Sequence, residues 1–384
     1  MIPLAIPNIA GNEAKYLQEC VETNFVSSVG PFVDRFEEMV AHASGSRHAV
    51  ATTSGTTGLH AALTAVGVGS GDLVVLPSMT FIASANAISH CGALPWLFDI
   101  EVEGWTLDPV QVEAALREKT ERRAEGVYHV ETERRIAAIM PVHTLGSPAN
   151  MLALTAVASK FDLPVVVDAA AALGSTCNGK KPGALGGDLS VFSFNGNKTV
   201  TAGGGGAVTG NDEALCARVR HLTTTAKVGA DYTHDVVGFN YRMSNLEAAV
   251  GCAQMECLDT FVSAKRRIAR RYDEALSEIY GVAPFPRAPW AESACWFSGV
   301  TLGPPATPDI EAVIASLVEC GVGARPFWKP VHLQAPYASA PVEATPVSTS
   351  IWDRVLTLPC STNLSEVDQK QVIAALRDIL GASA

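Results

Sequence analysis

The chain lacks any apolar stretch long enough to cross a bilayer. Although 48% of its 384 residues are hydrophobic, no run approaches the roughly 20 consecutive apolar residues that a transmembrane helix requires. The segment Met1 to Pro7 also lacks the basic residues that precede the apolar core of a secretory signal. We therefore expect a cytoplasmic protein with no membrane partner.

Positive charge is also scarce. Lys and Arg number 28 against 39 Asp and Glu, which gives a formal net charge of −11. A nucleic-acid-binding domain or an anionic-membrane surface ordinarily has the opposite balance. The sequence therefore predicts no nucleic-acid partner.

The chain has no C-x-x-C motif and no nearby His pair at metal-ligand spacing, although it contains nine cysteines. We expect these thiols to be buried small hydrophobes in a reducing compartment, with no disulfide framework and no metal site. The glycine run Gly203 to Gly206 does not have the G-x-G-x-x-G order that follows the first strand of a dinucleotide-binding unit. This argues against a nucleotide-binding oxidoreductase.

Apolar runs of strand length alternate with helical stretches between about residues 48 and 210. Continuous apolar strands indicate burial on both faces, and strand–helix–strand order indicates an α/β fold with a mostly parallel sheet between helices. The expected strands are Ala49 to Thr53, Leu73 to Leu76, Leu94 to Phe98, Ile136 to Pro141, Pro164 to Val167 and Leu189 to Phe194. The expected helices between them include Thr57 to Val66, Ile82 to Cys91 and Met151 to Phe161.

The C-terminal third has a different pattern. Ser244 and Glu247 have capping-box spacing and open a predicted helix that ends near Leu258. A long charged helix, roughly 261–279, is expected to lead into a smaller α+β domain whose last helix is capped by Ser365. We therefore predict a large domain over residues 1–260 and a small domain over 261–384. The segment 116–135, dense in Arg and Glu, is interpreted as a solvated helix and loop.

Two residues carry the strongest chemical signal. Lys198 lies between the apolar run Leu189 to Phe194 and four glycines, where a ligand can approach a desolvated amine. Asp168 ends the apolar strand before it, and open α/β sheets bind ligands at the carboxyl ends of their strands. A Schiff-base lysine with an acidic partner is what pyridoxal 5′-phosphate requires. Most lysines are nevertheless solvated surface residues, so Lys198 alone does not establish the cofactor.

Weaker signals point the same way. Ser54-Gly55-Thr56 lies between a strand and a helix, where backbone N–H groups, hydroxyls and the helix N-terminus suit a phosphate, although an ordinary N-cap uses the same residues. Ser193 is either a further phosphate hydroxyl or a strand serine. Phe81 either stacks on a flat ring or fills core.

In this order the motifs closely resemble the DegT/DnrJ/EryC1/StrS sugar aminotransferases, which are fold-type I pyridoxal-phosphate enzymes. The matching stretches are Ser54 to Thr56, Pro77 to Phe81, Pro141 to His143, Asp168 to Gly174, Phe192 to Lys198, Gly238 to Met243, and Arg325 to Pro330 with His332. The resemblance implies a seven-stranded, mostly parallel sheet and a homodimer with shared active sites.

The resemblance also implies residue roles. Lys198 forms the Schiff base, Asp168 pairs with the pyridine nitrogen, and Phe81 covers the ring. Gly55, Thr56 and Ser193 hold the phosphate, together with Asn240 from the neighbouring subunit. Ala171 stands where the family commonly has a polar residue near the cofactor's 3′-oxygen, which leaves the tilt of the ring open. Related dehydratases replace the lysine by histidine, so the presence of Lys198 argues against that branch.

The substrate is predicted by the same resemblance. The expected reaction transfers the amino group of L-glutamate to the C4 ketone of a nucleotide-linked 4-keto-6-deoxy hexose, an N-acetylated UDP-sugar of the kind that feeds bacillosamine or nonulosonic acids. The predicted substrate-binding residues are His143, Arg325, Trp328, Lys329 and His332; for the last four, a structural loop is the competing interpretation. The alternatives are a 3-aminotransferase acting on a 3-keto sugar nucleotide and a non-catalytic regulator that keeps the fold.

Overall fold

The central sheet has seven strands. The computed structural model describes residues 1–303 and 309–381. Strand order is β1-β10-β9-β7 in one ladder and β3-β2-β6-β5-β4 in the other, where β5 and β4 extend the edge at β6 as an antiparallel hairpin. Parallel bridges from Ile139 to Val165 and from Val142 to Asp168 join β6 to β7. Among the seven central strands only β10 runs antiparallel to its neighbours, so the predicted mostly parallel sheet is confirmed. The strands are β1 (His48–Thr52), β2 (Leu73–Pro77), β3 (Leu94–Phe98), β6 (Arg135–Ile139), β7 (Val166–Asp168), β9 (Leu189–Ser193) and β10 (Gly206–Gly210).

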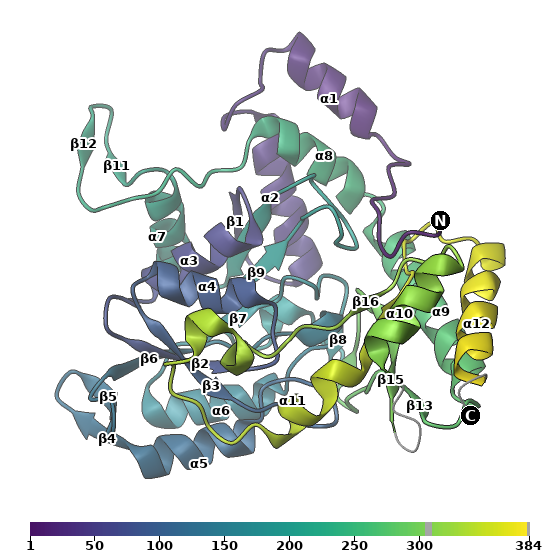
Figure 1. The fold of residues 1–384 in the computed structure, drawn as a ribbon. Coiled ribbons are helices and arrows are strands. Elements are labelled where there is room, and N and C mark those ends of the chain that lie inside the picture. The colour runs from purple at the N-terminus through teal and green to yellow at the C-terminus, as the bar shows by residue number, and fades with distance from the viewer. Residues whose placement is uncertain (304–308, 382–384) are drawn as a thin grey trace.

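Both faces of this sheet are buried, because side chains alternate between two apolar cores. In β2, Leu73 and Val75 pack into one core, whereas Val74 and Leu76 pack into the other. Helices α3, α4 and α7 cover the second core, and α2, α5, α6 and α8 cover the first (Figure 1). The helices up to this point are α1 (Glu13–Glu22), α2 (Pro31–Ser44), α3 (Gly55–Ala65), α4 (Ile82–His90), α5 (Pro109–Lys119), α6 (Met151–Phe161), α7 (Glu213–Thr223) and α8 (Asn245–Met255).

A third apolar core lies in the C-terminal part, between an antiparallel sheet of order β13-β15-β17-β16 and three helices. Helix α9 is amphipathic, with Ile268 and Tyr272 buried in this core, and Ile2 joins it through a bridge to Val322. The division at residue 260 stays a prediction. The elements are α9 (Leu258–Leu276), β13 (Val282–Pro284), β14 (Ala291–Glu292), β15 (Ser298–Leu302), α10 (Ile310–Glu319), β16 (Arg325–Pro326), α11 (Pro346–Ile351), β17 (Val355–Leu358) and α12 (Glu366–Gly381).

Two sequence-based expectations need correction. The segment 116–135 contains an antiparallel hairpin, β4 (Thr120–Arg123) and β5 (Gly126–His129), and its charges are solvated at the sheet edge. Of the nine cysteines, all free, Cys91 and Cys257 are half-buried and Cys320 is exposed, so burial was predicted correctly for the other six only. The remaining short strands are β8 (Thr176–Cys177), β11 (Lys227–Val228) and β12 (Thr233–His234). Among the described residues, no helix combines the length and apolar character needed to cross a membrane.

Candidate active site

A cavity of about 390 Å³ opens at the carboxyl ends of β7 and β9. Its walls come from both the N-terminal and the C-terminal part of the chain: Phe81, just before α4, and Arg325 and Trp328, after β15, all line it. Nine of the twelve predicted site residues line it: Gly55, Thr56, Phe81, His143, Asp168, Ser193, Lys198, Arg325 and Trp328. Ala170 and Ala171 line it as well.

Lys198 enters the cavity from the turn after β9. Its backbone N–H donates to Asn195 O at 3.0 Å, which tightens the turn that carries the lysine. Burial of the amine lowers the pKa of Lys198 to about 8, and the carboxylate of Asp168 opposes this shift. At pH 7 about a tenth of the amine is therefore neutral, far more than for an ordinary lysine, and the neutral form is the one that acts as a nucleophile or proton acceptor.

Asp168 is the last residue of β7 and is only 6% exposed. Ser84 Oγ donates to its Oδ2 at 2.6 Å, and the backbone N–H of Ala170 donates to its Oδ1 at 3.1 Å. Burial raises the pKa of Asp168, while these two hydrogen bonds and the charge of Lys198 act to lower it. A cationic group inside the cavity would favour the ionised form.

Ser84 is a residue that the sequence analysis missed. It is fully buried on α4, where its hydroxyl also lies 2.9 Å from Thr80 Oγ1, so a short hydroxyl chain holds one oxygen of Asp168. The available signal was a serine among the apolar residues Ala85, Ala87 and Ile88 of the same helix. Its partner, 84 positions away, could not be inferred from that pattern.

The cavity contains a cradle suited to an anion. Ser54 caps α3 in a capping box with Thr57, so the helix starts at Gly55 and presents first-turn N–H groups that lack intrahelical acceptors. Ser193 lies opposite: a Cβ added to Gly55 would lie 3.0 Å from Ser193 Cβ. A Cβ on Gly206 would lie 2.5 Å from the backbone carbon of Ser54. Glycine is therefore required at positions 55 and 206, because the start of α3 lies so close to β9 and β10.

His143 is 1% exposed and lines the same cavity. Its Nδ1 accepts a hydrogen bond from the backbone N–H of Ala149 at 3.2 Å, while its buried Nε2 has no partner among the described residues. Burial lowers the pKa of His143 to about 3, so the ring is neutral and carries its proton on Nε2. This N–H is therefore a donor that has no acceptor in the described part of the chain.

Aromatic side chains border the cavity. Phe81 is 54% exposed, and its ring centroid lies 5.9 Å from that of Trp328. Trp296, which the sequence analysis did not single out, also lines the cavity. An exposed phenylalanine in a cavity wall offers a flat apolar face to a ring-shaped ligand.

Three predicted residues lie outside the cavity in this chain. His332 is held elsewhere, with its Nδ1 2.6 Å from Ser78 Oγ, and Lys329 Nζ lies 6.0 Å from the ring of Trp352. Asn240 is exposed and pairs through its backbone with Thr224. Its expected contact with a neighbouring subunit stays a prediction.

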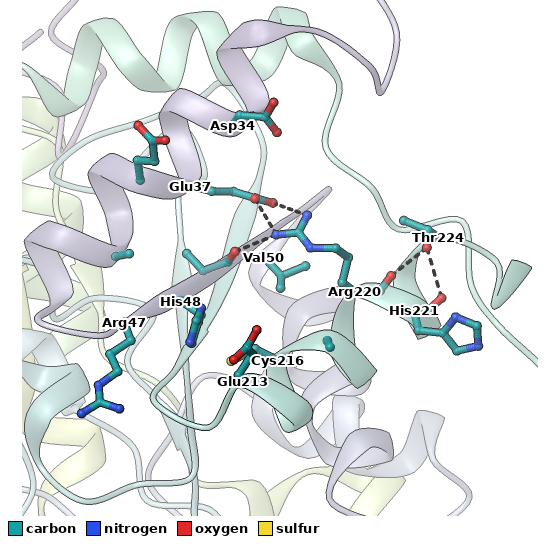
Figure 2. Close-up of a pocket in the computed structure, with 14 residues that line it drawn as sticks. Asp34, Glu37, Arg47, His48, Val50, Glu213, Cys216, Arg220, His221 and Thr224 are labelled. Atoms are coloured by element: carbon teal, nitrogen blue, oxygen red, sulfur yellow. Dashed lines mark hydrogen bonds and ion pairs between the residues drawn. The ribbon is translucent and has the colours of Figure 1, made fainter. Parts of the chain in front are cut away.

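A second, larger cavity of about 630 Å³ lies between α2, β1 and α7 (Figure 2). Its central side chains satisfy one another: Arg220 forms two hydrogen bonds with Glu37, at 2.6 and 3.1 Å, and a third with Ala49 O. None of the residues predicted to act chemically lines it.

Comparison with known proteins identifies a family. Residues 7–377 match the sequence profile of the DegT/DnrJ/EryC1/StrS aminotransferase family. The chain is 38% identical to a GDP-perosamine synthase of Caulobacter vibrioides (99% of this chain, 98% of the relative) and 34% identical to one of Vibrio cholerae (98% and 99%). A crystal structure of DesI with its TDP-sugar product superposes with a TM-score of 0.87 at 31% identity, covering 99% of this chain and 92% of that one.

Proposed function

Because the chain belongs to the DegT/DnrJ/EryC1/StrS aminotransferase family, we propose that it transfers the amino group of L-glutamate to the C4 ketone of a nucleotide-linked 4-keto-6-deoxy hexose. It is a pyridoxal 5′-phosphate-dependent aminotransferase that acts on nucleotide sugars. The observation that carries the proposal is one cavity that holds Lys198, Asp168 and an anion cradle together.

The residues present fit the cofactor. First-turn N–H groups of α3 and the hydroxyl of Ser193 suit its phosphate, the buried Asp168 suits its ring nitrogen, and Phe81 offers a face to the ring. Lys198 supplies the amine for a covalent link. When bound, pyridoxal 5′-phosphate supplies the electron sink that lets an amino group exchange with a ketone.

Each residue then has a chemical task. The buried Asp168 would hold the ring nitrogen of the cofactor, and a cationic nitrogen there would favour the ionised carboxylate, because an opposite charge offsets desolvation. Lys198 Nζ, with its pKa near 8, would carry the proton between carbon atoms during transfer of the amino group. His143 lines the cavity and its Nε2 has no partner among the described residues, which supports a role as hydrogen-bond donor to a substrate oxygen.

For the sugar, both relatives described above are GDP-perosamine synthases, whose product is a 4-amino sugar nucleotide. Their names support amination at C4 and favour a GDP-linked substrate over the N-acetylated UDP-sugar expected from the sequence. Arg325 and Trp328 line the cavity and suit a diphosphate and a ring, respectively.

The test is a substrate panel. Purified enzyme is incubated with L-glutamate and GDP-, UDP- or TDP-linked 4-keto-6-deoxy hexoses, and products are read by mass spectrometry and NMR. We expect a 4-amino sugar nucleotide and 2-oxoglutarate. An amino group at C3 would establish the 3-aminotransferase alternative. A cofactor band that is unchanged by glutamate would favour the non-catalytic regulator.

We further propose a cytoplasmic homodimer in which Asn240 reaches the partner's phosphate site. The β11–β12 hairpin projects from the body of the chain (Figure 1) and exposes Tyr232 and, just beyond it, Val237, at 91% and 86%. Large exposed apolar side chains of this kind support burial against a second copy. Nine free thiols support a reducing compartment.

Mixing Lys198→Ala with Asn240→Ala chains tests the shared site. One site of each heterodimer would then contain both the lysine and the partner's asparagine, so activity at limiting cofactor should exceed the sum of the two parents. The Asn240→Ala parent should bind cofactor roughly tenfold to a hundredfold more weakly, the loss of one hydrogen bond to a dianion. Strictly additive activity, or a monomer in sedimentation, would place the site within one chain.

A further inference from the structure

Trp296 makes two separate contacts with the segment that carries Lys198. Its ring centroid lies 3.7 Å from Lys198 Nζ, and its indole Nε1–H donates to the backbone oxygen of Asn197 at 2.7 Å. Asn197 and Lys198 are neighbours, whereas Trp296 is about a hundred positions away, immediately before Phe297 and β15. The side chain is 4% exposed, so both contacts are shielded from water.

The backbone and ring of Trp296 make further contacts that fix its position. Its backbone N–H donates to Leu145 O at 3.1 Å, and its backbone oxygen accepts from Nζ of the buried Lys265 at 2.9 Å. Phe297 packs against the ring with centroids 4.2 Å apart. A ring fixed at this many points can hold a mobile lysine side chain in one place, since little further ordering is needed when the lysine docks.

We propose that Trp296 is a positioning residue for Lys198: its ring face holds the free ammonium, and its indole N–H fixes the turn that carries the lysine. The inference rests on the role proposed for Lys198 and not on the identity of the sugar. It gives the amine a defined resting place whenever it is not joined to the cofactor, so that it remains inside the cavity.

The two ways in which Trp296 can act on the amine have opposite effects. A cation–π contact favours the ammonium and therefore raises the pKa of Lys198. Exclusion of water disfavours the ammonium and therefore lowers it. Removing the ring thus lowers the pKa if the ring holds the cation, and raises it if the ring acts only as a wall.

The experiment measures the pKa of this one amine in the full-length chain after hydroxylamine has released the cofactor as its oxime and dialysis has removed both. Trace acetylation at increasing pH, followed by peptide mapping, reports the reactivity of Lys198. We expect Trp296→Leu to lower its pKa by about one unit, and Trp296→Phe, which keeps an aromatic face, to lower it less. An unchanged or higher pKa in Trp296→Leu overturns the proposal.

Two controls keep the result specific. Trp290 lies on the same segment, and its indole N–H also donates to a backbone oxygen, that of Pro148, so Trp290→Leu should leave the pKa of Lys198 unchanged. If Trp296→Leu does not fold, the wild-type chain is produced with fluorinated tryptophans. The pKa of Lys198 should then fall stepwise with fluorination, and this effect should be absent in Trp296→Phe. If the pKa does not change with fluorination, the proposal is contradicted. No sugar enters the measurement, so an incorrect sugar assignment leaves its outcome unaffected.

Discussion

The cavity at Lys198 and the cavity at Arg220 both contain charged side chains, but they differ in how those charges are satisfied. In the larger one, between α2 and α7, both oxygens of Glu37 are hydrogen-bonded to Arg220, and one also accepts from Ala51 N–H. In the smaller one, among the described residues, Lys198 Nζ makes no hydrogen bond and the buried His143 Nε2 has no partner.

This difference distinguishes a structural cavity from a chemical one better than volume does. A buried polar atom without a partner costs free energy in the protein alone, so one that lines a cavity beside a reactive amine is completed by a ligand or an ordered water. The Glu37–Arg220 pair needs no such ligand. Substitutions in the smaller cavity should therefore change catalysis, and substitutions in the larger one should change stability.

The largest effect is expected for Lys198→Ala, which removes the amine of the smaller cavity. Transamination should fall to background while the fold persists, because the side chain makes no structural hydrogen bond. Borohydride treatment of the wild-type holoenzyme and peptide mapping should place the cofactor on Lys198. Lys180→Ala, on the exposed surface, is the matched control. A label on any other lysine would refute the assignment.

Asp168→Asn should lower turnover by at least about tenfold to a hundredfold, since a charge-assisted hydrogen bond to the ring nitrogen contributes roughly 1.5–3 kcal/mol. Cofactor retention, read from its visible absorbance after gel filtration, should fall much less because the phosphate contacts remain. Near-normal turnover in this variant would contradict the role of Asp168.

Comparing Lys198 and Asp168 with Ser84 shows which site residues can be predicted from the sequence. Asp168 and Lys198 were predictable because strand ends and glycine runs are local features, and parallel strands bring their carboxyl ends together. Ser84 and Trp296 were missed because their partners are 84 and 99 positions away. A contact between residues this far apart in the chain leaves no local pattern in a single sequence.

The same reasoning applies to the fold. Strands such as β2 were predicted because burial on both faces leaves a continuous apolar run. The β4–β5 hairpin was missed because its edge strands are charged and solvated, so Glu121 and Arg122 look like a loop. Lys329 and His332 were predicted together with Arg325 from the family motif. In the structure a 3₁₀ turn covers Val331–Leu333 and His332 Nδ1 lies 2.6 Å from Ser78 Oγ. The substrate-binding roles of Lys329 and His332 stay predictions.

Ser84→Ala should have a smaller effect than Asp168→Asn, a drop in turnover of roughly threefold to tenfold, because it removes one hydrogen bond to a carboxylate that is still present. The Ser84 hydroxyl helps to lower the pKa of Asp168 against burial, so its loss raises that pKa further. The acid limb of the kcat/KM profile should therefore move to higher pH. A profile that does not move would show that Ser84 only fills space.

The smallest effect on turnover is expected for Arg220→Ala in the larger cavity, where kcat should stay within about twofold of wild type. The free energy of unfolding should instead fall by about 1–2 kcal/mol, because Glu37 loses its charged partner, although the arginine side chain is 43% exposed and solvent weakens the pair. Arg47→Ala is the matched control: Arg47 lines the same cavity and is exposed, so both quantities should remain near wild type (Figure 2). Denaturant unfolding and steady-state kinetics on the three proteins decide the matter. A large loss of turnover in Arg220→Ala with an unchanged unfolding midpoint would mean that the larger cavity also takes part in the chemistry, and that satisfied charges do not exclude a functional site.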